Sequence, residues 1–118
     1  MTGKTAARKI AFDRLTFGPR FAYGEMAGIT EVVGGGDGTA LGTGFARFRD
    51  ADIPWTVKYD EVILVLEGAV EIDTPEGTIS AGPRDCIWLP DGTELRYRAR
   101  HALVFYAITP VNWAERAS

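Results

Sequence analysis

The side chain in this sequence best suited to acid–base chemistry is Glu61, because it interrupts an otherwise apolar alternating pattern. Side chains two residues apart point to the same face of a β-strand, so Glu61 is expected to share a face with Trp55, Val57, Tyr59 and Ile63. A carboxylate on a buried apolar face is desolvated, which raises its pKa unless a cation or a hydrogen-bond donor compensates. Such a group can act as a general acid or base, or orient the amine or hydroxyl of a ligand.

The residues expected around Glu61 lie on neighbouring strands. Arg47, Tyr59 and Tyr97 each fall on a predicted inward face. We assign catalytic roles to Glu61 and Tyr59. Ligand-binding roles are assigned to Arg47, Trp55, Trp88 and Tyr97. Two structural alternatives to these roles remain open. Glu61 could be held by an arginine and a tyrosine in a buried network, and Trp88 could pack in the core.

Short strands must position these residues, because no stretch carries a helical stripe and turn signals recur throughout. The pattern predicts strands at 28–33, 41–49, 55–67, 69–73, 78–81, 85–89, 93–98 and 102–109. Strand 69–73 is expected to pair with strand 55–67 across a tight turn at Glu67–Gly68. Residues 50–54 are expected to form a polar turn, and residues 74–77 are expected to form a hairpin tip. Many short strands in one small chain predict an all-β sandwich or barrel.

Composition indicates an ordinary soluble globular protein. The chain has 118 residues, of which 46% are hydrophobic and 25% charged, enough for one domain. The net charge of −3 argues against a nucleic-acid partner, and no apolar run is long enough to span a membrane. The single cysteine, Cys86, excludes an internal disulfide and predicts a cytoplasmic location; its apolar neighbours predict that it is buried.

The central stretch resembles the cupin superfamily, which consists of double-stranded β-helix (jelly-roll) barrels. Glu61 and Gly68 keep the second half of the first cupin motif, and Asp85, Pro90 and Gly92 keep the frame of the second. The resemblance covers roughly residues 41 to 109. It implies one cupin domain over residues 1–118, with an N-terminal arm at 1–23 and a barrel core at 41–109.

A narrower resemblance is to the cupin domain of the ethanolamine-utilisation protein EutQ family. It rests on Pro54-Trp55-Thr56, on Tyr59-Asp60-Glu61-Val62 and on Ser80-Ala81-Gly82. It implies a role near ethanolamine breakdown and bacterial microcompartments. An acetate kinase activity proposed for the family is not carried over, because the glycine-rich run at 34–38 lacks the features of a phosphate-binding loop.

The cupin resemblance also shows which residues are missing for a metal site. Counting back from Glu61, the motif's two histidines fall on Trp55 and Val57, or on Pro54 and Thr56 if the gap is one residue longer; the late histidine falls on Leu95. None of these side chains replaces imidazole as a metal ligand, and His101 lies outside both motifs. A carboxylate-only site would need a second inward acid, for which Glu94 and Glu25 are nominated.

Two functions therefore remain open, and no metal or cofactor is expected for either. The first is a histidine-free pocket around Glu61 and Tyr59 that binds or acts on a small polar molecule. The second is a non-catalytic binding or assembly protein that acts through its surface or dimer contacts. The apolar N-terminal arm favours a homodimer, because small cupins often exchange such arms.

Overall fold

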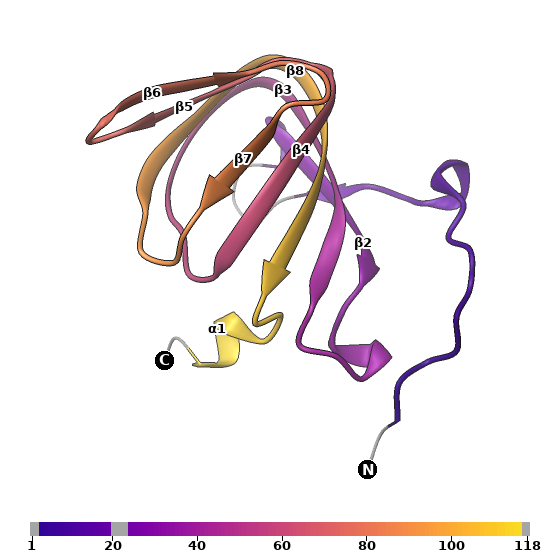
Figure 1. The fold of residues 1–118 in the computed structure, drawn as a ribbon. Coiled ribbons are helices and arrows are strands. Elements are labelled where there is room, and N and C mark those ends of the chain that lie inside the picture. Colours follow the sequence, from indigo (N-terminus) through magenta and orange to yellow (C-terminus); the bar gives the residue numbers. More distant parts are fainter. Residues whose placement is uncertain (1–2, 20–23, 117–118) are drawn as a thin grey trace.

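Two long strands organise the fold of the chain, which a computed structural model describes over residues 3–19 and 24–116 (Figure 1). They are β3 (Gly42–Thr56) and β8 (Glu94–Thr109), which pair antiparallel along their whole length. The other strands are β1 (Gly18–Pro19), β2 (Ala27–Val33), β4 (Asp60–Gly68), β5 (Val70–Thr74), β6 (Gly77–Ala81) and β7 (Cys86–Leu89). One helical turn, α1 (Trp113–Arg116), follows β8, and 3₁₀ turns lie at Phe12–Arg14 and Gly35–Asp37.

The second edge of β8 closes the sheet into a barrel. Its first half pairs with β5 and its second half with β4, which in turn pairs with β7. Strands β1 and β2 extend the sheet from the other side, on β3. The result is the all-β jelly-roll barrel predicted from the sequence. None of the helices within the described residues is long and apolar enough to cross a membrane.

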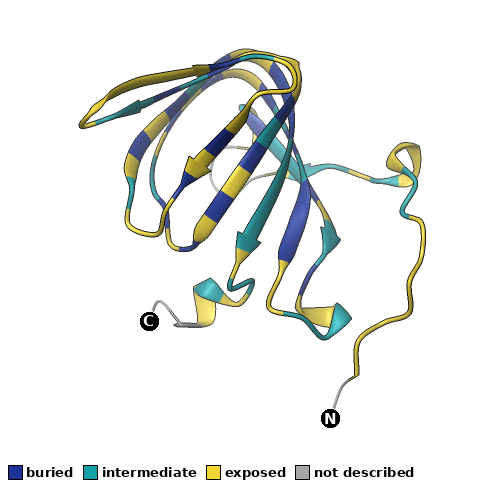
Figure 2. Cartoon of the chain, viewed as in Figure 1, coloured by how far each residue is buried: buried dark blue, intermediate teal, exposed yellow. Residues whose placement is uncertain are grey.

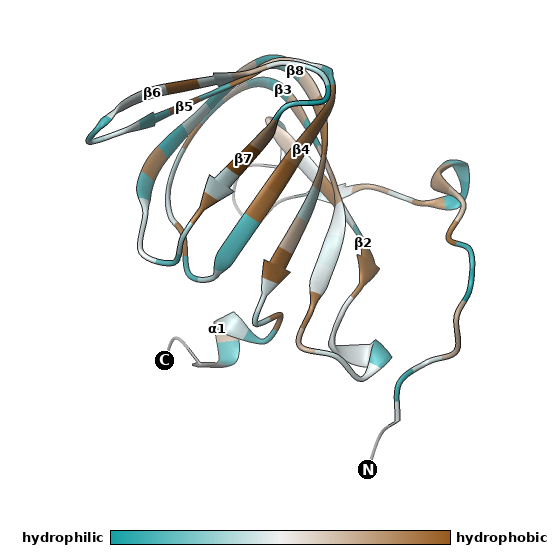
Figure 3. Cartoon of the chain, in the orientation of Figure 1, coloured by the Kyte–Doolittle hydropathy of each residue, from teal (hydrophilic) through white to brown (hydrophobic). Residues whose placement is uncertain are grey.

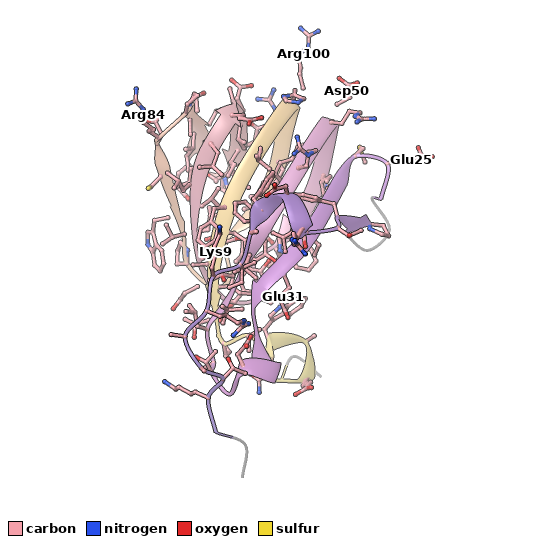
Figure 4. All side chains as sticks on the ribbon, turned by 90° about the vertical axis from the view of Figure 1, so that its right-hand side faces the viewer. Lys9, Glu25, Glu31, Asp50, Arg84 and Arg100 are labelled. Atoms are coloured by element: carbon pink, nitrogen blue, oxygen red, sulfur yellow. The ribbon has the colours of Figure 1, made fainter. Side chains whose placement is uncertain are left out.

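The strand pair β3–β8 turns a corner at Asp50, and this corner changes which residues face inward. Asp50 has a left-handed backbone (φ 43°), and Asp50 and Arg100 project together from one end of the barrel (Figure 4). From Gly44 to Phe48 the buried residues of β3 are even-numbered; after the corner they are odd-numbered, as at Ile53. The predicted polar turn at 50–54 is therefore wrong, because β3 passes through it without ending.

The core lies inside the barrel and is built from strand residues of alternating burial. Figure 2 shows buried and exposed bands alternating along β4 and β7, and Figure 3 shows hydrophobic stretches in β4, β7 and β8. Burial of one large aliphatic side chain contributes about 1.5–3 kcal/mol. The largest fully buried side chains are Ile53, Val57, Val65, Val70, Ile72, Leu89 and Val104.

Strand β5 pairs differently from the prediction. The sequence pattern predicts that residues 69–73 fold back on strand 55–67, but β5 pairs with β6 and β8. Strands β4 and β5 follow one another along the same edge of β8, since Gly68 lies opposite Ala102 and Glu71 opposite Arg98. The chain thus continues past Gly68 (φ 75°) instead of reversing there.

Other strand boundaries also differ from the sequence pattern, although the hairpin tip at 74–77 is confirmed by the pairing of Thr74 with Gly77. The predicted strand 55–67 is interrupted between Thr56 and Asp60, and the predicted strands 93–98 and 102–109 are one strand, β8. Backbone hydrogen bonds explain the interruption: the Val57 N–H donates to Thr93 O at 2.9 Å, outside the β4 ladder.

An ion-pair cluster on the outer surface ties β5 to β8. The Arg98 guanidinium donates to both Asp73 carboxylate oxygens, at 2.8 and 3.0 Å, and lies 2.9 Å from Glu71. Hydrogen bonds from Arg98, and then from Thr78, lower the pKa of Asp73 to about 2. Arg98 of β8 therefore pairs with two acids of the neighbouring strand.

The N-terminal arm covers the outer face of the β3–β8 pair. The Phe12 ring meets Phe45 at a centroid distance of 5.0 Å, and Phe45 meets Phe105 at 5.3 Å. Further along the arm, Phe17 lies under the Arg47 guanidinium. Residues 20–23, which complete the predicted arm, lie outside the described residues.

Candidate functional site

A cavity of about 190 Å³ lies inside the barrel, beside the end of the chain. Residues from β2, β3, β4 and β8 form its wall, together with Tyr59 just before β4, Val111 after β8 and Trp113 at the start of α1. Most of the wall is aliphatic or aromatic. The lining residues are Ile29, Glu31, Ala46, Phe48, Tyr59, Glu61, Ile63, Tyr97, Val104, Tyr106, Ile108, Val111 and Trp113.

The predicted carboxylate, Glu61, is part of this wall. It lies near the start of β4, between Leu89 of β7 and Ile108 of β8, and it is only 6% exposed. The Tyr97 hydroxyl donates a buried hydrogen bond to Glu61 Oε1 at 3.4 Å. This bond is longer than the usual 2.7–2.8 Å or so for a hydroxyl donor. The alternation of the sequence correctly placed Glu61, Tyr59 and Tyr97 around one interior space.

Two aromatic rings, one of them near the chain end, line the cavity side by side. The rings of Tyr59 and Trp113 have centroids 5.2 Å apart, with planes inclined at 59°. A backbone hydrogen bond of 2.7 Å from Val111 N to Ala40 O holds the segment that carries Trp113. The sequence did not predict a role for Trp113, because this segment shows no periodic pattern and reaches the cavity only through tertiary packing.

Tyr106 completes the aromatic wall because glycine occupies the position opposite it. Gly44 pairs with Tyr106 across β3 and β8. A Cβ added at Gly44 would lie 2.6 Å from the Tyr106 hydroxyl oxygen and would also collide with the Thr30 carbonyl. The absence of a side chain at position 44 therefore lets the Tyr106 ring lie over the strand.

A second acid, Glu31, also lines the cavity, and the sequence pattern did not reveal it. Glu31 is an exposed residue of β2 and shares its alternation with Ile29, which also lines the wall. A Cβ at Gly34 would collide with the Glu31 carboxylate, so glycine at that position leaves it room. The nominated acids, Glu25 and Glu94, are not in the wall of this cavity.

Two of the predicted ligand-binding residues lie elsewhere. Arg47 faces the outside of the barrel, where its guanidinium carbon is 5.3 Å from the centroid of the Phe17 ring. The reason is the corner at Asp50, which makes even-numbered residues the inward ones in this half of β3. Trp88 is 59% exposed, because Ile87 and Leu89 are the inward residues of β7. Both predicted positions of Trp88, in the pocket and in the core, are therefore wrong.

Trp55 and Cys86 also differ from expectation. Trp55 is partly buried and supports the wall from behind, since its ring meets Trp113 at a centroid distance of 5.8 Å. It is not itself a lining residue. Cys86 is exposed, because it shares the outward face of β7 with Trp88.

The residues at the expected metal-ligand positions do not fit a metal ion. Val57 and Leu95 are buried apolar side chains, and the Trp55 ring meets the Trp113 ring edge to face. Over residues 3–19 and 24–116, no group of three or more histidine, cysteine, aspartate or glutamate side chains is arranged to hold an ion. His101 is exposed and lies outside the cavity wall.

Comparison with known proteins gives consistent matches along almost the whole chain. A family model described as "Ethanolamine utilisation protein EutQ" matches residues 12–115. The chain is 33% identical over 116 residues to a protein of Escherichia coli (strain K12) named acetate kinase EutQ, covering 96% of this chain and 49% of that protein. The chain thus spans about half the length of the curated relatives it matches.

Solved structures agree with the fold. The crystal structure of an ethanolamine utilisation protein Q from Salmonella typhimurium superimposes with a TM-score of 0.85 at 28% identity, covering 95% of this chain and 93% of that one. A sugar phosphate isomerase of the cupin superfamily from Silicibacter pomeroyi gives a TM-score of 0.69 at 18% identity, over 86% and 75% of the two chains. This second likeness concerns the fold alone.

Proposed function

This chain belongs to the EutQ family of ethanolamine utilisation proteins, within the cupin superfamily, and on that premise we propose that its barrel binds a small polar molecule in the cavity beside Glu61. One observation carries the proposal: a buried carboxylate and a tyrosine hydroxyl meet in the wall of an otherwise largely apolar cavity. Ligand sites typically combine an apolar wall with a few convergent polar groups. The molecule would serve the utilisation of ethanolamine.

The geometry around Glu61 suits a ligand that carries an amine or a hydroxyl group. The carboxylate accepts hydrogen bonds or a proton, and the hydroxyl groups of Tyr59 and Tyr97 can donate or accept. The 3.4 Å bond between Tyr97 and Glu61 leaves room for a ligand atom to compete for either partner. Long hydrogen bonds of this kind are common in sites without substrate and shorten when the ligand binds.

The size of the cavity limits the ligand to a small molecule. Pockets for drug-sized ligands have volumes of about 300–1,000 Å³, whereas this cavity has about 190 Å³. A ligand of a few non-hydrogen atoms fills that space. The cavity therefore supports binding of a small metabolite and not of a nucleotide.

The kinase name of the curated relatives is not transferred to this cavity. Acetate and phosphate groups are anions, and proteins bind them with arginine, lysine or backbone N–H groups. Both charged residues in the described part of the wall, Glu31 and Glu61, are acids. The chain spans about half the length of these relatives, so an activity of the whole relative is not assigned to it.

The proposal is tested by a thermal-shift screen of small amines, alcohols and carboxylates. At about 100 times its Kd, a ligand stabilises the folded state by about 2.7 kcal/mol, which raises the Tm by several degrees. The matched variant is Ala46→Leu, which fills part of the cavity from β3. We expect a ligand that raises the Tm of the parent and not that of Ala46→Leu. A library without any such ligand, or with equal shifts in both proteins, contradicts the proposal.

A second candidate function, assembly into a homodimer, is favoured by an exposed apolar strip on the outer face of β4 and β7. Val62 is 44% exposed, Leu66 38% and Trp88 59%, and Val62 and Trp88 are direct cross-strand neighbours. Residues with this exposure and chemistry are typical of interfaces. Sedimentation at micromolar concentration is expected to give a dimer for the parent and a monomer for Trp88→Ser. A monomeric parent contradicts the assembly proposal.

A further inference from the structure

The charges in the cavity wall point to one class of ligand. Within the described residues, the wall contains the carboxylates of Glu31 and Glu61 and no lysine, arginine or histidine. Arg84 and Arg100 project from the end of the barrel opposite α1, whereas Glu31 lies toward the α1 end (Figure 4). The local electrostatic potential is therefore negative, and it attracts a cation.

Aromatic faces reinforce this preference. Rings of Phe48, Tyr59, Tyr97, Tyr106 and Trp113 line the same cavity. A cation is attracted to the negative face of such a ring, most strongly to that of tryptophan. The planes of Tyr59 and Trp113 are inclined at 59°, so these two rings do not form a flat stack. Sites lined by several aromatic rings are known to recognise ammonium ligands through this attraction.

The two carboxylates occupy different depths. Glu61 is buried in β4, next to Tyr97, whereas Glu31 is exposed on β2. The side chain of Glu31 lies against Gly34, in the space that a Cβ at that position would take. Glycine at position 34 therefore leaves space for the Glu31 carboxylate, which lies at the mouth of the cavity, whereas Glu61 lies deeper.

We propose that the ligand of this cavity is a small organic cation, a primary amine in its ammonium form, with Glu61 as its deep partner and Glu31 as the specificity residue at the mouth. This inference rests on the proposed function, because it names the ligand class of the same cavity. An ammonium group donates hydrogen bonds to carboxylates, and its alkyl part contacts the apolar wall. A carboxylate ligand of the same size meets repulsion from both acids.

Titrations with three probes of matched size test the charge requirement. The probes are n-propylamine, n-propanol and propanoate, added to the parent protein at neutral pH in isothermal titration calorimetry. We expect the amine to bind at least about tenfold more tightly than the alcohol, a difference of about 1.4 kcal/mol, and propanoate not to bind. Tetramethylammonium, which lacks N–H donors, is expected to bind more weakly than the amine and to separate aromatic attraction from hydrogen bonding.

Variants at the mouth test the part played by Glu31. Glu31→Gln is expected to weaken amine binding roughly tenfold and to leave the weak binding of n-propanol unchanged. Gly34→Ala is expected to act in the same direction, because it displaces the Glu31 side chain. The matched control is Glu76→Gln, a change at an exposed hairpin tip, which is expected to bind the amine like the parent. The Tm of each variant without ligand shows whether it is folded.

The outcomes separate this inference from the proposed function. One outcome is that the amine binds no better than the alcohol or propanoate, while some neutral or anionic molecule stabilises the parent and not Ala46→Leu. In that case the inference is overturned and the proposed function stands. If amine affinity is equal in Glu31→Gln and the parent, Glu31 is not the specificity residue. If no small molecule of any charge stabilises the parent more than Ala46→Leu, both proposals fail together.

Discussion

Replacing Glu61 with glutamine is expected to weaken ligand binding roughly ten- to a hundredfold and to leave the barrel folded. Hydrogen bonds to a charged group contribute about 1.5–3 kcal/mol, and each 1.4 kcal/mol or so is tenfold in affinity. Glutamine keeps the shape of the side chain and an oxygen that accepts the hydrogen bond from the Tyr97 hydroxyl, so the neighbouring core is not disturbed. The Kd of the best ligand from the thermal-shift screen, measured by isothermal titration calorimetry, gives the effect.

The matched control is Glu67→Gln, which makes the same chemical change on the same strand. Glu67 is exposed near the end of β4, outside the cavity wall, so its substitution is expected to leave the Kd unchanged. Equal affinities in the parent and Glu61→Gln would show that the carboxylate does not take part in binding. Equal losses in Glu61→Gln and Glu67→Gln would point to a general effect of net charge.

Replacing Gly68 with alanine is expected to destabilise the fold by about 3 kcal/mol or more, because backbone strain and a steric collision add together at this position. Gly68 has a left-handed backbone (φ 75°). A Cβ there would collide with the His101 carbonyl and lie 3.0 Å from Ala102 Cα, so strand β8 itself would have to move. Urea unfolding followed by tryptophan fluorescence measures the loss in free energy.

Two other glycines separate the sources of this loss. Gly92 also has positive φ (93°), but a Cβ there meets no atom within 4 Å, so Gly92→Ala measures backbone strain alone, about 1 kcal/mol. Gly82 has open space and no positive φ, so Gly82→Ala is expected to be close to neutral. If Gly68→Ala is no less stable than Gly92→Ala, the described contact between β4 and β8 is wrong.

Much of the site was predictable because strands impose a strict period of two. Tyr59 and Glu61 lie on the inward face that the alternation predicts, and Tyr97 on β8 faces the same interior. The pattern works here because the charged residues Lys58 and Asp60 alternate with the buried residues Val57 and Tyr59.

The errors have equally specific causes. The inward-facing residues of β3 change from even-numbered to odd-numbered at Asp50, so Arg47 faces outward. No residue pattern before position 50 predicts this corner. Residues 86–89 are all apolar, so alternation could not show that Trp88 faces outward. Placing β5 beside β8 depends on which strand edges are already paired, a property of the whole sheet.

The cavity residues that the sequence pattern did not reveal depend on tertiary structure. Trp113 reaches the cavity because the segment after β8 folds back over the barrel end. Glu31 lines the cavity through the pairing of β2 with β3 and the room left by Gly34. An acid at an exposed strand position resembles any solvated side chain until its neighbours across the sheet are known.

The most direct test of the cavity as a ligand site uses the three tryptophans as reporters. In protein labelled with fluorotryptophan, the fluorine resonances of Trp55, Trp88 and Trp113 are followed during titration with the best ligand of the screen. We predict a large shift for Trp113, which lines the cavity, a smaller one for Trp55, which touches Trp113, and none for the outward-facing Trp88. A titration in which Trp113 stays unchanged, or in which Trp88 alone shifts, would contradict binding in the cavity.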